Sequence, residues 1–403
     1  MKHVTAPALA ALAVLSTPFG ALAGEEVAWR LFVADHAQPR LLAIDLESGT
    51  VLDSFALPGA ATLYATPGKR AVYAVAGDAN KVAVIASGVE IADHGDHGDL
   101  RLTAPALTDA VLTGDRPVHF VEHEGQVAVF YDGEGAARLY SEAALLDGDT
   151  NGREVRTAAP HHGVAIPMDD HTLLTQPNAD DPTALPTGLW VLDAQGEKLG
   201  DFHPCPDLHG EASSGNIVAI ACGTGLLLAR EGASGPDITF LPYGANLPAG
   251  KATTLLGGSG FQYFLGNYGA DRVVIIDPSV ADAFRLVDLP TRRVHFAVDP
   301  QRPKFAYVFT EDGNLLQLDI LSAAITGSLR LTEPYSMDGE WNLPRPRVAV
   351  AGGEIAVTDP LEGLIHIVDA QSFAKTREIA VEGTPFNIVA VGGAGETHGH
   401  HHH

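Results

Sequence analysis

A seven-residue stretch, DHGDHGD at positions 93–99, concentrates side chains that bind metal ions. The members that can act as ligands are Asp93, His94, Asp96, His97 and Asp99. Neutral imidazole combined with carboxylate suits zinc, and copper or nickel acceptably, whereas calcium prefers oxygen ligands alone. The glycines between them admit positive φ, so we expect residues 88–100 to form a flexible loop rather than a strand or helix. An acidic surface loop with incidental histidines is the alternative, and this stretch alone does not separate the two.

Four more histidines recur at one position of a sequence repeat, near the start of a short apolar strand. They are His119, His162, His209 and His295, and the other repeats carry Tyr64, Thr254, Arg347 and Asn387 there. The first three histidines fall in consecutive repeats, so their imidazoles are expected to converge. Three nitrogen ligands with one further ligand make a tetrahedral zinc site. We expect Asp96 or His97 to supply that ligand as the loop closes over the ion.

Residues beside these histidines are weaker candidates for the same site. His161 precedes His162 and points to the opposite face by strand alternation, and His94 is a further ligand candidate in the loop. Glu211 lies two residues after His209 on the same face, where it is either a ligand or a hydrogen-bond acceptor for one. His295 falls nearly across the ring from the other three, and we expect a structural role or a second site for it.

An all-β repeat must position these side chains. Two apolar strands joined by a turn rich in Gly, Ser or Ala recur eight times, starting at Leu41, Val82, Ala128, Leu189, Leu226, Val273, Leu315 and Leu364. The spacing of about 35 to 60 residues, with hardly any helical periodicity, is typical of a β-propeller. We predict one propeller of eight blades, with seven as the alternative.

The two ends of the repeat array predict how the ring closes. The first unit begins at 30–35 without an inner strand, and the segment from Pro385 is an inner strand with no unit after it. Pairing the two leaves no exposed sheet edge. We therefore expect a propeller domain over 24–394 and a His-rich tail over 395–403. The tail is either an expression tag or a native metal-binding segment.

The first 23 residues predict export. Lys2, an apolar run over 6–21 and the Ala-Leu-Ala sequence ending at Ala23 form a secretory signal peptide, cleaved after Ala23, which indicates the periplasm. No other apolar run is long enough to span a membrane, so we do not expect a membrane-embedded protein. In an oxidising compartment the two cysteines, Cys205 and Cys222, are expected to form one disulfide.

The charge balance narrows the choice of partners. Asp and Glu number 50 against 25 Lys and Arg, for a formal net charge of −25. This balance argues against nucleic acid and anionic membranes as partners. We expect a monomer.

With these residues identified, the sequence resembles the AztD-type periplasmic zinc metallochaperones, which pass zinc to the solute-binding protein of an ABC zinc importer. The segments that carry the resemblance are 93–99, 116–135, 161–167 and 205–222. The resemblance implies a β-propeller, zinc binding, and direct hand-over to a periplasmic zinc solute-binding protein rather than catalysis.

Two other functions compete with that of a zinc carrier. A secreted metal-dependent propeller hydrolase would use a metal-bound water with Glu211 as a general base. A structural or protein-binding propeller would bind metal only weakly, and that binding would disappear with the C-terminal histidines.

Overall fold

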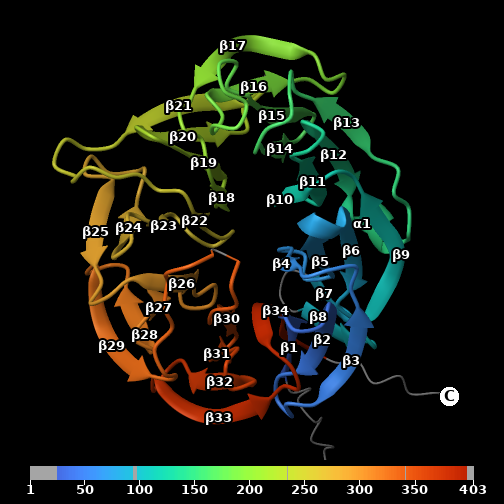
Figure 1. Ribbon diagram of the computed structural model, residues 1–403, viewed down its shortest axis with the longest axis vertical. Helices are drawn as coiled ribbons and strands as arrows, with labels where there is room; N and C mark the ends of the chain where they lie inside the picture. Colours follow the sequence, from blue (N-terminus) through green and yellow to red (C-terminus); the bar gives the residue numbers. More distant parts are fainter. Residues whose placement is uncertain (1–24, 94–97, 234, 341, 397–403) are drawn as a thin grey trace, which may run out of the picture.

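Eight sheets, antiparallel except where β34 (Pro385–Glu396) meets β8 (Gly98–Leu102), surround a common axis and form a β-propeller, as predicted (Figure 1). The structure is a computed structural model that describes residues 25–93, 98–233, 235–340 and 342–396. Within each blade the strands follow one another from the axis outward. Among the described residues, no helix is long and apolar enough to cross a membrane.

Each blade contains four strands. The first four blades are β34 (Pro385–Glu396), β1 (Glu25–Asp35), β2 (Arg40–Asp45), β3 (Val51–Ala56); β4 (Thr62–Ala65), β5 (Ala71–Ala76), β6 (Lys81–Ala86), β9 (Ala106–Thr113); β10 (Pro117–His123), β11 (Gln126–Tyr131), β12 (Ala136–Ser141), β13 (Arg153–Arg156); and β14 (Ala165–Met168), β15 (His171–Gln176), β16 (Gly188–Leu192), β17 (Lys198–Pro204). The other four are β18 (Glu211–Ser214), β19 (Ile217–Cys222), β20 (Gly225–Arg230), β21 (Asp237–Pro242); β22 (Leu255–Leu256), β23 (Phe264–Asn267), β24 (Arg272–Ile276), β25 (Phe284–Asp288); β26 (Arg293–Val298), β27 (Phe305–Thr310), β28 (Asn314–Asp319), β29 (Ala324–Arg330); and β30 (Val348–Ala351), β31 (Glu354–Asp359), β32 (Leu364–Asp369), β33 (Ala374–Ala380). Helix α1 (Glu142–Leu146) and the 3-10 turn η1 (Gly77–Ala79) lie in connections.

The hydrophobic core lies between the blades. One cluster joins Phe32 and Leu41 of blade 1 to Val72 and Ile85 of blade 2, all fully buried. The other clusters likewise combine residues of neighbouring sheets. Because every blade is packed on both faces, its strands read as nearly continuous apolar runs, which is why the repeat was visible in the sequence.

The ring closes by pairing the two ends of the described chain. Strand β34 pairs antiparallel with β1 from Glu25↔Glu396 to Asp35↔Pro385, which confirms the predicted closure. Asp35 fixes the junction: its Oδ1 accepts hydrogen bonds from the backbone N–H of Thr384 (2.9 Å) and Ala37 (2.8 Å). Its Oδ2 accepts one from Arg40 Nε at 2.9 Å. Gly383, with φ +120°, passes so close that an added Cβ would lie 2.1 Å from Asp35 Oδ2.

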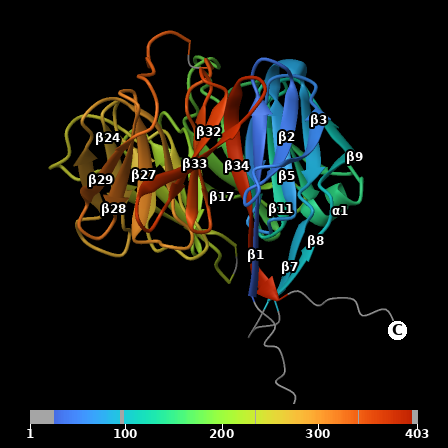
Figure 2. The same cartoon turned by 90° about the horizontal axis from the view of Figure 1, so that it is seen from below.

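All inner strands begin at one rim of the ring, which we call the start mouth, and end at the far mouth. Asn387, near the start of β34, donates from Nδ2 to the carbonyl of Ala61, just before β4, at 3.0 Å. From there β34 runs to Glu396, a span of about 30 Å at roughly 3.3 Å per residue. In the side view, the end of β34 lies at the bottom together with the start of β1 (Figure 2).

The segment 88–100 is not the loop that we expected. It forms a hairpin of β7 (Val89–Asp93) and β8 (Gly98–Leu102), inserted between β6 and β9 of blade 2. The flanking residues Val89 and Leu100 are buried in the core between blades 1 and 2, and this burial outweighs the flexibility of the glycines. The outer strand of blade 2 is consequently β9 rather than 88–93, which the repeat had suggested.

We predict that Asp35→Asn weakens ring closure. Burial raises the pKa of Asp35, but the N–H groups of Thr384 and Ala37 and the Arg40 guanidinium outweigh it and leave that pKa below its usual range. A lowered folded-state pKa contributes stability above the unfolded value near 3.9, and this contribution is lost as the pH falls through the folded value. Asp35→Asn should therefore lower the free energy of unfolding by about 2–3 kcal/mol at pH 7.

Urea denaturation at pH 7 and pH 3 measures this effect. The difference in the free energy of unfolding between wild type and Asp35→Asn should be smaller at pH 3 than at pH 7. Asp53→Asn, which changes an exposed carboxylate, should unfold with the same free energy as wild type at either pH. A difference of equal size at both pH values would contradict the assignment.

Candidate metal centre

Three histidines from consecutive blades meet at the start mouth. His119 is the third residue of β10, while His162 and His209 lie in the segments that lead into β14 and β18. The Nε2 atom of His162 lies 3.1 Å from Nε2 of His119 and 3.3 Å from Nε2 of His209. In the described part of the chain these three form the group whose ligand atoms all lie within 4.8 Å of one another. We call them the triad.

Two members of the triad form hydrogen bonds through Nδ1, the imidazole nitrogen that faces away from the other two histidines. His162 Nδ1 lies 2.7 Å from Asp132 Oδ2, and His209 Nδ1 lies 2.8 Å from the carbonyl oxygen of Thr253. Carboxylate and carbonyl oxygens only accept hydrogen bonds here, so each Nδ1 must carry the proton. In a neutral imidazole Nε2 is then unprotonated, and its lone pair faces the neighbouring ring.

His119 has a looser partner of the same kind. Its Nδ1 lies 3.9 Å from Oε2 of Glu211, a carboxylate oxygen that is buried without a hydrogen-bond partner in the described structure. A small rotation would let Nδ1–H donate to it. Burial raises the pKa of Glu211 to about 7, which places this carboxyl between its neutral and charged forms near neutral pH.

The surroundings of His119 and His209 favour their neutral forms. Burial, with the charges of His162 and His209 added, lowers the pKa of His119 to about 3, and burial likewise lowers the pKa of His209. Neutral imidazoles with unprotonated Nε2 atoms this close would repel one another through their lone pairs. A cation between the three Nε2 atoms removes that repulsion.

The spacing suits zinc. Ligand nitrogens about 2.0–2.1 Å from a tetrahedral ion are about 3.3 Å apart, close to the two separations of 3.1 and 3.3 Å in the triad. Three imidazoles leave one tetrahedral position for water or an incoming ligand. The Asp132–His162 pair also matches the carboxylate–histidine arrangement that orients metal ligands in proteins.

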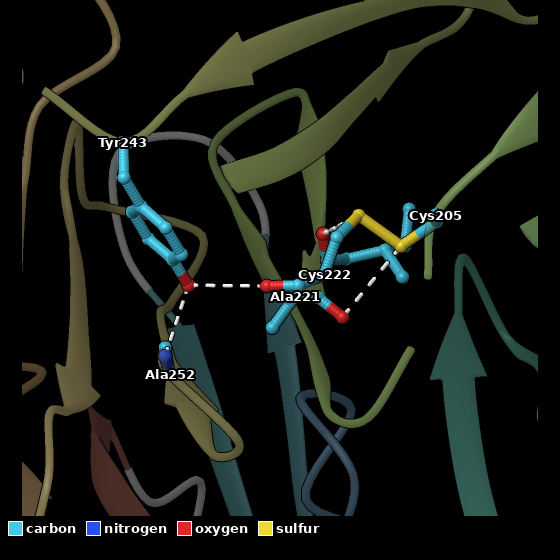
Figure 3. Close-up of a disulfide and its surroundings, with 6 residues drawn as sticks. Cys205, Ala221, Cys222, Tyr243 and Ala252 are labelled. Atoms are coloured by element: carbon cyan, nitrogen blue, oxygen red, sulfur yellow. Dashed lines mark hydrogen bonds between the residues drawn. A yellow bond between two sulfur atoms is a disulfide. The ribbon is translucent and has the colours of Figure 1, made fainter. Parts of the chain in front are cut away.

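A disulfide lies just before the segment that carries His209. Figure 3 shows this bond between Cys205 and Cys222. Cys205 follows the outer strand of blade 4 and is bonded to Cys222 at the end of β19 in blade 5, 17 residues away, as the sequence predicts. Beyond it, His209 donates its backbone N–H to the carbonyl of Ala221 at 3.0 Å. Closing a loop of this length contributes roughly 3 kcal/mol in the chain-entropy model. The disulfide therefore restricts where His209 can lie.

Of the remaining sequence candidates in the described part of the chain, His161 does not join the triad. His161 is buried and uses both ring nitrogens, at 3.0 Å from the Ala159 carbonyl and 3.0 Å from Thr175 Oγ1, so its candidacy as a ligand does not fit the structure. His94, Asp96 and His97 lie outside the described residues. The strands β7 and β8 on either side of them lie at the far mouth, where Asp99 pairs with Glu396, so the hairpin leaves the propeller at the end opposite the triad.

Sequence reasoning missed two groups that orient the triad. Asp132 follows β11, and the apolar strand ending in Asp was visible in the repeat, but so many strands end this way that the pattern selected no single residue. Thr253 acts through its backbone carbonyl, which no side-chain pattern can reveal. Asn267 fixes that carbonyl in place, because its Oδ1 accepts the N–H groups of Thr253 and Thr254, each at 2.8 Å.

Comparison with known proteins places this geometry in a family. The chain is 50% identical to the zinc chaperone AztD of Citrobacter koseri over 402 residues, covering 100% of this chain and 96% of the relative. The chain belongs to the AztD family of zinc chaperones. A crystal structure of Citrobacter koseri AztD superposes with a TM-score of 0.91 at 52% identity, over 93% of this chain and 100% of that one.

A second AztD structure agrees with the assignment, and a more distant protein shares only the fold. The apo form of Citrobacter koseri AztD gives a TM-score of 0.88 at 50% identity, over 92% of this chain and 100% of that chain. The dihydro-haem d1 dehydrogenase NirN, at 13% identity and a TM-score of 0.60, shares the fold alone. That match covers 90% of this chain and 74% of NirN. No family model matches the chain.

We predict that Asp132→Asn weakens zinc binding to this AztD-family protein without unfolding it. The amide still accepts a hydrogen bond from His162 Nδ1 but lacks the charge that makes the imidazole a stronger ligand, so the dissociation constant should rise about tenfold, and further in Asp132→Ala. Competition with a chelating dye measures this change. Glu134→Gln, in the same turn but paired with Arg138, is the matched control and should bind as wild type. Equal affinity in Asp132→Ala and wild type would contradict this role.

Proposed function

We propose that this protein is a periplasmic zinc chaperone that holds one zinc ion at His119, His162 and His209. The observation that carries the proposal is the convergence of three Nε2 atoms, two of them unprotonated because their Nδ1 atoms donate elsewhere. Zinc is cargo here rather than a cofactor. Membership of the AztD family supports this function, since the curated relative is named a zinc chaperone.

We further propose that delivery proceeds by ligand exchange through the open fourth position. The three imidazoles come from three blades, and two of them are anchored at Nδ1, so the triad itself has little freedom to open. An incoming ligand from the acceptor would take the fourth position first and then displace the imidazoles in turn. The start mouth, where the triad is partly exposed, is then the face that meets the acceptor.

The proposed acceptor is the solute-binding protein of an ABC zinc importer. The signal peptide predicted at 1–23 and the Cys205–Cys222 disulfide both favour an oxidising compartment such as the periplasm. The net charge of −25 would guide the approach of a less acidic acceptor. We propose a transfer protein rather than an enzyme.

A metal-dependent hydrolase is the second candidate, and one observation bears on it. Glu211 has a pKa raised by burial to about 7, which suits a general base. Its carboxylate, however, lies near Nδ1 of His119, on the side of the ring away from the Nε2 atoms. A base for metal-bound water must reach the open coordination position, so the position of Glu211 favours orientation of His119 instead.

We predict that each single substitution in the triad weakens zinc binding. In a protein spanning 24–396, which keeps all of β34 but lacks the terminal histidines, one site with a dissociation constant of about nanomolar or below is expected. His119→Ala, His162→Ala and His209→Ala should each weaken it about tenfold or more. His123→Ala, at the other end of β10, should leave it unchanged. Dye competition provides the affinities.

A second variant distinguishes a zinc site at the triad from one in the hairpin. Replacing His94 and His97 together with Ser should leave the tight site intact, because β7 and β8 lie at the far mouth. If this variant lost the tight site while the triad variants kept it, the zinc site would lie in the hairpin rather than at the triad. Micromolar binding in the wild-type protein would instead favour a structural propeller.

We predict that transfer to the acceptor is direct. When zinc-loaded protein is mixed with the zinc-free solute-binding protein, the observed rate should rise with acceptor concentration and exceed the spontaneous release rate measured with a chelator that traps free zinc. A rate equal to spontaneous release at every acceptor concentration would mean that zinc passes through solution. Zinc-free solute-binding protein from an importer of another metal is the matched control acceptor.

A further inference from the structure

Two arginines and a histidine lie at the start mouth, on the side of the propeller opposite the triad. Arg293 and His295 belong to the start of β26, and Arg347 immediately precedes β30. These blades lie across the ring from β10 (Figure 1). All three side chains are partly exposed, so solvent reaches them although they lie close to the ring axis.

Neither arginine has a carboxylate partner among the described residues. Arg347 donates only one long hydrogen bond, from Nη1 to the Pro346 carbonyl at 3.4 Å, and its guanidinium lies over the Phe386 ring at 4.7 Å. Arg293 donates to the carbonyls of Gly269 (3.0 Å) and Arg272 (3.2 Å). Both guanidinium groups are therefore held in place by neutral groups.

Two neighbouring arginines, which are also partly exposed, do have carboxylate partners. Arg272 pairs with Asp288 at 2.7 Å and with Asp271 at 3.9 Å. Arg292 pairs with Asp338 at 2.7 Å and with Glu311 at 3.9 Å. The chain has 50 acidic residues against 25 Lys and Arg. Even so, of these four arginines, Arg293 and Arg347 are the two that lack a carboxylate partner among the described residues.

His295 adds a third donor between the two arginines. Its Nδ1 accepts the backbone N–H of Val348 at 3.0 Å, so the neutral ring carries its proton on Nε2. Burial lowers the pKa of His295, and the charges of Arg347 and Arg293 lower it further, which keeps the ring neutral. Among the described residues, the hydrogen bond of the His295 ring is the one at Nδ1, so the Nε2–H group remains available to a ligand.

Arg345 fixes the segment that presents Arg347. It is buried and donates to the carbonyls of Ser336 (2.9 Å), Asp338 (3.0 Å) and Glu340 (3.1 Å), which folds the 331–347 connection around its guanidinium. This connection rises above the ring at the top of the side view (Figure 2). Burial, together with the charge of Arg345, lowers the pKa of Arg347 to about 10.

We propose that Arg347 and His295, with Arg293 beside them, bind a small oxyanion at the start mouth. Desolvating a guanidinium without a counter-charge is costly, and the carboxylates of the described residues leave this cluster uncompensated. A planar guanidinium presents paired N–H donors that match a carboxylate or phosphate group. The ligand class is therefore a small carboxylate or phosphate anion, bound independently of zinc.

Titration calorimetry of the zinc-free protein with citrate and with inorganic phosphate, at low ionic strength, tests the proposal. The two anions distinguish carboxylate from phosphate as the preferred head group. Binding should weaken as salt is added. Arg347→Gln should weaken binding about tenfold or more, and Arg347→Lys, which keeps the charge but not the paired donors, should weaken it to a lesser extent. Arg292→Gln, which changes a neighbouring arginine that is paired with Asp338, should bind as wild type.

Thermal unfolding without added anion provides a second readout. If Arg347 is an uncompensated charge awaiting a ligand, Arg347→Gln should be no less stable than wild type, and the stabilisation of wild type by citrate or phosphate should be absent in the variant. Zinc affinity should be equal in both proteins, so this result does not depend on the zinc site. Equal anion affinity in wild type and Arg347→Gln, no binding of either anion up to about 10 mM, or a variant destabilised in the absence of anion would overturn the proposal.

Discussion

The hydrogen bond between His162 Nδ1 and Asp132 is the constraint on which the site depends. It holds the proton on the side of the imidazole away from the ring axis and directs the Nε2 lone pair toward two further imidazoles, at 3.1 and 3.3 Å. The carbonyl of Thr253 does the same for His209. Such an arrangement is unfavourable when empty and favourable around a cation. In the proposed zinc site, the tautomers of the imidazoles would therefore contribute to binding as well as their positions.

The propeller supplies the rigidity that this arrangement needs. Each imidazole comes from a different blade, and the blades are held by cores that lie between neighbouring sheets. Closure of the ring through β1 and β34 fixes the angle between blades, and the Cys205–Cys222 disulfide limits the segment before His209. A site built this way cannot release its ion by bending one loop. Release through the open fourth position, with an acceptor ligand entering first, is the route that this geometry favours.

Much of the architecture was readable from the sequence because strands buried on both faces are continuously apolar and recur at regular spacing. That regularity predicted eight blades, the closing strand and the register that brings His119, His162 and His209 together. The hairpin β7–β8 was missed because the glycines and charged residues of 93–99 concealed the buried Val89 and Leu100 on either side. Asp132 and the Thr253 carbonyl were missed because their roles arise from contacts between blades, which no local pattern encodes.

The start mouth has the histidine triad on one side and, on the other, two arginines without a carboxylate partner among the described residues. The proposal that zinc occupies the triad can be tested by locating the ion. Anomalous diffraction at the zinc edge, from crystals of the 24–396 protein grown with one equivalent of zinc, is the most direct measurement. The account predicts a single strong peak about 2.0–2.1 Å from the Nε2 atoms of His119, His162 and His209. A strong peak elsewhere, with none between these three nitrogens, would contradict it.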